Sequence, residues 1–384
     1  MSDKKVSPMF VNVGEVTYDN PEYSGIIDDQ SSANDQMPSV VKSGKTTFLL
    51  CSALDRSQDA TVFKSINLFN GKKYVVKILH EDYPKKDEIE ANLTNQSVFS
   101  SSGILELILC EQTEKYLYFV FPYCQNGDLF HYILEHGPIT NPKCLVNVLY
   151  SMTLAVKFLH DEAMIHNHLR PQSFLLSDHF SESEFSEEKF QTLLSGFSHS
   201  MKESDIEEET EFDFIKPDDI FIAPELLAPP KVEPTEPTEP TKPTEPTEPW
   251  VPKPSKATDI YSLGVTFYMI VMGYSPTYIE GQVRKILEQA DRNETDKKDT
   301  DYRFHNTKWE SKNFYVRELI QKMMKSDPKE RFTIEDVMSH RYFDSIKDRK
   351  VNSPMISEII QSTQKEYLDN MPEEEESPYP AWNF

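Results

Sequence analysis

The chain has few basic residues for its number of acidic ones. Its 384 residues include 40 lysines and arginines against 64 aspartates and glutamates, a formal net charge of −24. Nucleic acids and anionic membranes select basic surfaces, so this balance argues against both as partners. We expect most of the excess acid to lie on solvated surface, where charged side chains are usually found.

Cysteines are scarce, and long apolar runs are absent. The 4 cysteines form no C-x-x-C pair, so neither a zinc site nor a disulfide framework is indicated. Residues 1–5 lack the apolar stretch of a signal peptide, and no run approaches the length of a membrane span. We therefore expect an intracellular protein that does not enter a membrane, in the cytoplasm or alternatively the nucleus.

One central motif organises the rest of the chain. Residues 166–173 read H-N-H-L-R-P-Q-S, after a helical period over 142–162 and before an apolar strand at 174–176. The frame H-x-x-L-x-P resembles the catalytic loop of eukaryotic protein kinases, H-R-D-L-K-P-x-x-N. In this register His168 stands at the catalytic Asp and Ser173 at the metal-binding Asn.

A second motif fits the same resemblance and carries the same kind of loss. Residues 193–198 read L-L-S-G-F-S, which puts Gly196 where the D-F-G motif has its metal-binding Asp. Glycine has no side-chain oxygen, and the Ser173 hydroxyl is a weaker magnesium ligand than an amide carbonyl. His166 and His168 are not flanked by a cysteine or an acidic pair. We therefore expect no metal site.

The N-terminal part of the domain reads as a β-hairpin that carries a lysine. Residues 61–68 alternate like a strand, 70–71 form an Asn-Gly turn, and 73–79 supply the partner strand. The segment Y-V-V-K-I-L resembles V-A-I-K, whose lysine holds nucleotide phosphates, so Lys77 takes that role; the alternative is a surface lysine. Val75 replaces a small residue against adenine and narrows the pocket. The glycine-loop positions are filled by Asp55, Ser57 and Ala60.

The resemblance implies the remaining parts of an ATP pocket. A helix over 86–99 would supply the glutamate that pairs with the strand lysine. Glu90 is the first candidate and Glu88 the second, although either could be a plain solvated glutamate. Phe121 stands at the gatekeeper position and Cys124 in the hinge. We treat Lys77, Glu90, Phe121 and Cys124 as a vestigial pocket and expect ATP to bind weakly or not at all.

Motifs that support the kinase fold are retained. A-P-E stands at 223–225, D-I-Y-S-L-G-V at 259–265 and D-P-x-x-R-x-T at 327–333. In kinases Glu225 would pair with Arg331, and Asp259 would bind the catalytic-loop backbone.

The segment that corresponds to the activation loop is strongly acidic. Asn167 replaces the family's phosphate-gripping Arg, and residues 198–222 carry many carboxylates. We expect this loop to be mobile and solvated, with docking to a basic patch on a partner as the alternative.

The expected fold is α+β: a bilobal protein-kinase-like domain with a small β-rich N-lobe and a larger α-helical C-lobe. A Pro-Thr-Glu repeat of period three fits polyproline II and marks an insertion, which is either a spacer with no further role or a ligand for a proline-recognising domain. The boundaries are a flexible N-terminal tail 1–45, a domain 46–343 (N-lobe 46–122, C-lobe 125–343, insertion 229–255) and an acidic C-terminal tail 344–384.

Four parts of the phosphotransfer machinery are altered together: the glycine loop, the catalytic Asp and both metal ligands. The sequence therefore predicts a pseudokinase, similar to the Ser/Thr calcium/calmodulin-kinase-like branch, that scaffolds or allosterically regulates a signalling partner. That partner would be a protein, either an active kinase or a proline-recognising domain. The alternative is an atypical Ser/Thr protein kinase with residual ATP-dependent phosphotransfer through Lys77 and His168.

Overall fold

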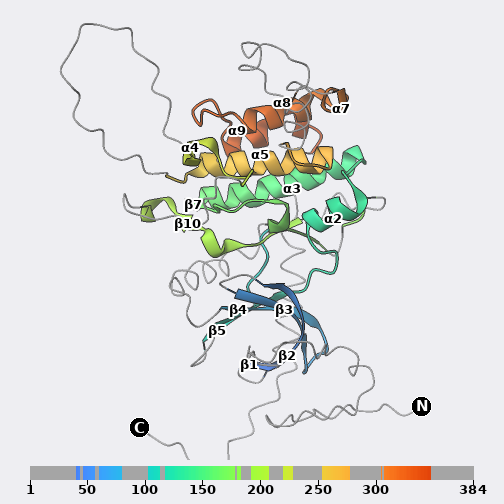
Figure 1. Cartoon of the computed structure of the whole chain (residues 1–384), viewed down its shortest axis with the longest axis vertical. Helices are drawn as coiled ribbons and strands as arrows, with labels where there is room; N and C mark the ends of the chain where they lie inside the picture. The colour runs from blue at the N-terminus through green and yellow to red at the C-terminus, as the bar shows by residue number, and fades with distance from the viewer. Residues whose placement is uncertain are drawn as a thin grey trace, which may run out of the picture.

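Figure 1 shows the strands β1–β6 gathered at one end of the molecule and the helices at the other. The elements follow the order expected of the bilobal fold, which is confirmed.

Among the described helices, none is both long and apolar enough to cross a membrane. This computed structural model describes residues 40–43, 46–56, 60–79, 103–112, 117–177, 180–182, 192–206, 219–227, 253–276, 304 and 307–346.

The small lobe is an antiparallel sheet of six strands in the order β1-β2-β3-β4-β6-β5. The expected hairpin is present: β3 and β4 pair around Gly71, whose φ of +69° is a conformation that glycine adopts without strain. The first strand begins before residue 46, so the boundary of the N-terminal tail at residue 45 is wrong. The strands are β1 (Val40–Ser43), β2 (Thr46–Arg56), β3 (Ala60–Asn67), β4 (Lys73–Leu79), β5 (Leu109–Gln112) and β6 (Leu117–Pro122).

The two faces of this sheet pack differently. Because side chains alternate along a strand, Val76 and Ile78 of β4 lie on one face, in a cluster formed by the small lobe itself. Leu79 and Phe121 belong instead to the main core, which continues into the helical lobe. Lys77 has the same parity as Leu79. The strand therefore presents Lys77 on the face that meets the large lobe.

The large lobe is built around two long helices, α3 and α5, which lie side by side (Figure 1). Asn141 caps α3, with Pro142 in its first turn, and Ser255 and Thr258 form a capping box on α5. Helix α5 is buried on nearly every side. The helices are α2 (Leu129–His136), α3 (Pro142–Asp161), α4 (Pro224–Leu227), α5 (Lys256–Met272), α7 (Thr307–Glu310), α8 (Phe314–Met323) and α9 (Ile334–Ser339).

Short strands and 3₁₀ turns of the large lobe shape the central motif. Two small antiparallel pairs, β7 with β10 and β8 with β9, flank the loop that contains it. The bounds are β7 (Met164–Ile165), β8 (Phe174–Leu176), β9 (Thr192–Leu194), β10 (Met201–Lys202), η1 (Pro171–Ser173), η2 (Phe197–His199), η3 (Glu203–Asp205) and η6 (Arg341–Phe343).

The apolar run at 104–110 forms a strand only from Leu109 onward. Its first residues pair across the lobes instead. Leu105 N donates to Leu194 O and Leu194 N donates to Gly103 O, each at 2.8 Å. The buried backbone N–H and C=O groups of this apolar run are satisfied equally well by either set of hydrogen bonds. The sequence alone therefore could not predict which set forms.

Several expectations lie outside the described residues. They are the helix over 86–99 with Glu88 and Glu90, residue Ser57, most of the N-terminal tail and of the C-terminal tail, and most of the insertion 229–255. At the C-terminal end, Ile346 is buried, so the ordered domain continues a few residues past 343.

Candidate functional site

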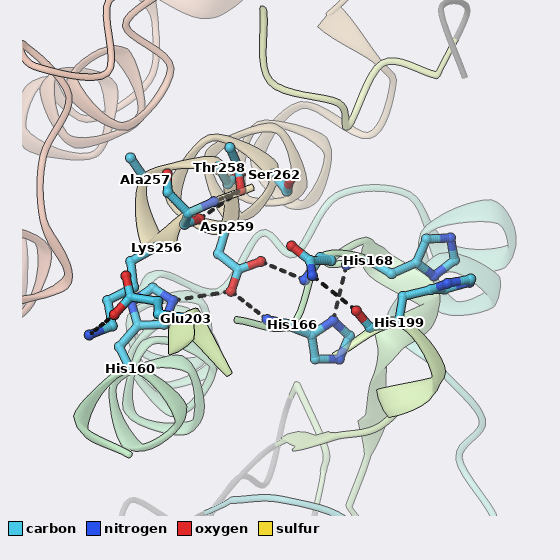
Figure 2. Close-up of polar contacts among 12 residues, drawn as sticks. His160, His166, His168, His199, Glu203, Lys256, Ala257, Thr258, Asp259 and Ser262 are labelled. Carbon is cyan, nitrogen blue, oxygen red and sulfur yellow. Dashed lines mark hydrogen bonds and ion pairs between the residues drawn. The ribbon is translucent and has the colours of Figure 1, made fainter. Parts of the chain in front are cut away.

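A buried carboxylate on α5 holds the central loop in shape. Asp259 accepts hydrogen bonds from His166 N at 2.8 Å, Asn167 N at 2.9 Å and His160 Nε2 at 3.1 Å (Figure 2). Three donors satisfy both carboxylate oxygens, as burial of a charged group requires. The expectation that Asp259 binds the loop backbone is confirmed.

His166 is completely buried and packs inside the central loop. Its Nε2 lies 3.0 Å from Ser195 O, and its ring meets the edge of Phe197 with centroids 5.0 Å apart. A carbonyl can only accept, so Nε2 carries the hydrogen and Nδ1 accepts from His168 N at 3.3 Å. Burial lowers the pKa of the imidazole to about 4, so it is neutral at neutral pH.

His168, at the catalytic Asp position, packs against a second imidazole. The ring centroids of His168 and His199 are 5.0 Å apart and the planes are tilted by 57° (Figure 2). A neutral imidazole can accept a proton, but it supplies no negative charge to hold a metal. Within the described residues, no group of three or more His, Cys, Asp or Glu side chains could hold a metal ion.

Positions 173 and 196 face the same small space. Gly196 is exposed, with φ of +88°, and a Cβ built on it would lie 3.7 Å from Ser173 Oγ. This is the proximity that a pair of metal ligands needs, yet neither position carries a carboxylate or an amide. The Ser173 hydroxyl donates to His168 O at 2.8 Å, so its hydrogen is already used. These residues do not fit Mg²⁺, which is held in proteins mainly by carboxylates.

Lys77 is engaged by the segment that replaces D-F-G. Its Nζ donates to Ser198 Oγ at 2.6 Å. Ser198 stands where the motif has its glycine, which carries no side chain. Sequence reasoning missed Ser198 as a partner of Lys77, although a hydroxyl in place of that glycine was a readable signal.

The other pocket residues of the described chain lie near Lys77. Val75 is opposite Phe121 in the β4–β6 ladder, one pleat away from Lys77, and Phe121 is buried. Cys124 follows β6 in the hinge and packs against the main core. Asp55 is exposed at the end of β2, where the glycine loop would begin. Phe121 thus lies on the strand beside the one that carries Lys77, Cys124 lies in the hinge that follows, and Glu90 lies outside the described residues.

The start of the activation segment makes specific contacts with the central loop and with α5. Asn167 adopts a left-handed φ of 64°, which asparagine tolerates, and its Nδ2 donates to His199 O at 3.0 Å. Farther along, Glu203 lies 3.0 Å from Lys256 Nζ (Figure 2). Residues 198–206 thus make defined contacts, and residues 202–205 are exposed, as expected of a solvated loop; residues 207–218 lie outside the described part.

Arg170 ties the far end of the activation segment to the loop. Its guanidinium donates to Asp219 Oδ2 at 2.7 Å and lies over the ring of Phe221, 5.3 Å from its centroid. The sequence reading did not anticipate this pair.

The ion pair of the large lobe forms as expected. Arg331 donates through both terminal nitrogens to the two Glu225 oxygens, at 2.6 and 2.8 Å. The Arg331 side chain is fully buried and also donates to Lys325 O and Ala257 O. Its fork of donors is thereby satisfied on all sides.

Comparisons with known proteins agree with this geometry. A family model described as protein kinase domain matches residues 56–343. Calcium-dependent protein kinase 19 of Arabidopsis thaliana is 24% identical over 330 residues, which cover 83% of this chain and 52% of that protein. This chain thus spans about half the length of the plant relative.

Two further similarities point the same way. Calcium/calmodulin-dependent protein kinase type I of Schizosaccharomyces pombe is 23% identical over 287 residues, covering 74% of each protein. A crystal structure of Rad53 in complex with AMP-PNP aligns with a TM-score of 0.50 at 18% identity, covering 77% of this chain and 65% of that one. At that identity the likeness concerns the fold alone.

Proposed function

The chain belongs to the protein kinase domain family, and on that premise we propose that it is a pseudokinase. It acts as a protein-kinase-fold binding module that scaffolds or allosterically regulates a signalling partner. Its own site transfers no phosphate. Its similarity to a calcium-dependent and to a calcium/calmodulin-dependent protein kinase supports a Ser/Thr, calcium/calmodulin-kinase-like relationship.

One observation carries this proposal. Positions 173 and 196 lie together as two metal ligands would, with Ser173 Oγ 3.7 Å from a Cβ built on Gly196, but they supply one hydroxyl and no carboxylate. Phosphoryl transfer depends on positioned metal ions that neutralise the charge developing on the transferred group. Without a ligand for the metal, the largest electrostatic contribution to catalysis is lost.

The expected loss is large enough to abolish useful turnover. Replacing the general base alone typically costs a factor of about 10²–10⁴ in rate. Losing the metal removes several kcal/mol more of transition-state stabilisation, and the rate falls tenfold for about every 1.4 kcal/mol lost. His168 could accept the proton of an attacking hydroxyl, but it cannot replace the positive charge that metal ions would place beside the phosphates.

The ATP pocket is weakened for related reasons. Val75 narrows the adenine side opposite Phe121, and Asp55 adds negative charge at the start of the glycine loop. We propose that ATP binds weakly or not at all. The protein would act in the cytoplasm through protein contacts: with an active kinase, or with a proline-recognising domain at the Pro-Thr-Glu repeat.

A phosphotransfer assay tests the proposal directly. The purified chain would be incubated with labelled ATP and a general protein substrate, in magnesium and separately in manganese. A Lys77→Ala variant serves as the matched control. We expect no transfer above that of the variant. Transfer that Lys77→Ala abolishes would favour the alternative, an atypical Ser/Thr kinase with residual activity.

A further inference from the structure

One side-chain bond spans the two lobes at the site. Lys77 on β4 and Ser198 in η2 are 121 positions apart in the sequence, and their side chains meet at 2.6 Å between Nζ and Oγ. Both residues are half-buried. An intact D-F-G motif could not form this bond, because its glycine carries no hydroxyl.

The backbone around Ser198 is held from both lobes. On the small-lobe side, Leu194 exchanges two backbone hydrogen bonds of 2.8 Å with Gly103 and Leu105. On the large-lobe side, Ser195 O accepts from His166 Nε2 at 3.0 Å, and Phe197 is completely buried. The Ser198 hydroxyl is therefore presented to Lys77 by a fixed segment.

We infer that Ser198 is an internal hydrogen-bond partner that competes with phosphate anions for the Lys77 ammonium. Its hydroxyl therefore weakens the binding of phosphate anions at this site. This inference rests on the proposed function, in which ATP binding is weak. A partner fixed within the same molecule competes at a high effective concentration, and it requires no ordering when the bond forms. A phosphate that approaches Lys77 must displace or share that partner, which lowers its apparent affinity.

The Lys77 ammonium also allows the opposite effect, in which Ser198 strengthens phosphate binding. An experiment can distinguish the two effects. An ammonium has three donors, so Lys77 could hold Ser198 and a phosphate together. In that case the Ser198 hydroxyl would add a donor to the anion and strengthen binding. Removing the hydroxyl then weakens binding, whereas under our inference its removal strengthens binding.

The test compares three variants with ATP as the probe. Ser198→Ala removes the hydroxyl, Ser198→Thr keeps it, and Ser204→Ala removes an exposed hydroxyl farther along the same segment. ATP affinity is measured by calorimetry, in EDTA and in magnesium. The melting temperature without ATP confirms that each variant folds.

We expect Ser198→Ala to bind ATP about five- to tenfold more tightly than the unaltered chain, the fold-change of one lost hydrogen bond of ordinary net strength. Ser198→Thr and Ser204→Ala should match the unaltered chain. Weaker or unchanged binding in Ser198→Ala, or no detectable binding in any protein, would overturn the inference. Each of those results leaves the pseudokinase proposal intact, because that proposal fails only if Lys77-dependent phosphotransfer is found.

Discussion

Arg331 and Glu225 form a two-pronged ion pair at 2.6 and 2.8 Å, in which the arginine side chain is fully buried. The residues are far apart in the sequence, and the pair fastens α4 to the segment before α9. It is part of what the chain has kept of the kinase fold.

Glu225→Ala should destabilise the domain by about 3–5 kcal/mol, because it leaves the Arg331 charge buried without a carboxylate to neutralise it. Urea unfolding would measure the loss. Lys157→Ala is the control: its pair with Asp161 is partly exposed, and its removal should cost less than about 1 kcal/mol. Equal effects in the two variants would contradict the role assigned to burial.

Gly264→Ala should also destabilise the domain, by about 1–3 kcal/mol, although alanine is the better helix former. A Cβ at this position on α5 would lie 2.9 Å from Met323 Cβ, so α8 would have to move away. The free energy of unfolding checks this. An increase in stability would show that the two helices separate without cost.

His166 should make stability fall as the pH falls. Its pKa is lowered from 6.5 to about 4 by burial, so between these values the unfolded state binds more protons than the folded state. The stabilising contribution is complete above pH 6.5, is lost at up to about 1.4 kcal/mol per pH unit on acidification, and levels off below about pH 4.

The measurement is the free energy of unfolding at several pH values for the unaltered chain and for His166→Gln, which keeps a donor for Ser195 O. The variant should show a shallower pH dependence in this window. A slope that His166→Gln does not alter would contradict the assignment.

Restoring the metal ligands should restore a response to magnesium. Gly196→Asp combined with Ser173→Asn places a carboxylate and an amide at the two facing positions. A Cβ at 196 meets nothing closer than 3.7 Å, and aspartate tolerates a positive φ better than most residues. We expect a rise in melting temperature with ATP that requires magnesium.

The matched control is Gly196→Ala with Ser173→Ala, which adds a Cβ at position 196 but supplies neither a carboxylate nor an amide. It should show no magnesium-dependent response. A restored pair that ignores magnesium would indicate that positions 173 and 196 are not the ligand positions of the family.

Much of the fold was predictable because its motifs are local and specific. The hairpin at Asn70-Gly71, the helix from Pro142 and the partners of Asp259 and Arg331 all follow from short patterns in a fixed register. The positions of Gly196 and Ser173 in the sequence also indicated what the site lacks.

The remaining features depended on contacts between distant segments. No residue near Leu105 in the sequence indicates that its backbone pairs with Leu194 rather than with a neighbouring strand. The bonds of Lys77 to Ser198 and of Arg170 to Asp219 join residues that only the folded chain brings together. The contacts that Asn167 and Lys256 make with the start of the activation segment could not be predicted for the same reason, because the composition of the segment is that of a solvated loop.

The hydrogen bonds from the central loop to Asp259 determine which positions of that loop can vary in sequence. Its carboxylate meets the loop only through the backbone N–H groups of His166 and Asn167, and every residue except proline offers that group. This hold therefore does not depend on which side chain stands at position 168, whereas the left-handed φ of 64° restricts position 167. The side chain at the family's catalytic position can thus differ while Asp259 keeps the backbone of the loop in the same shape.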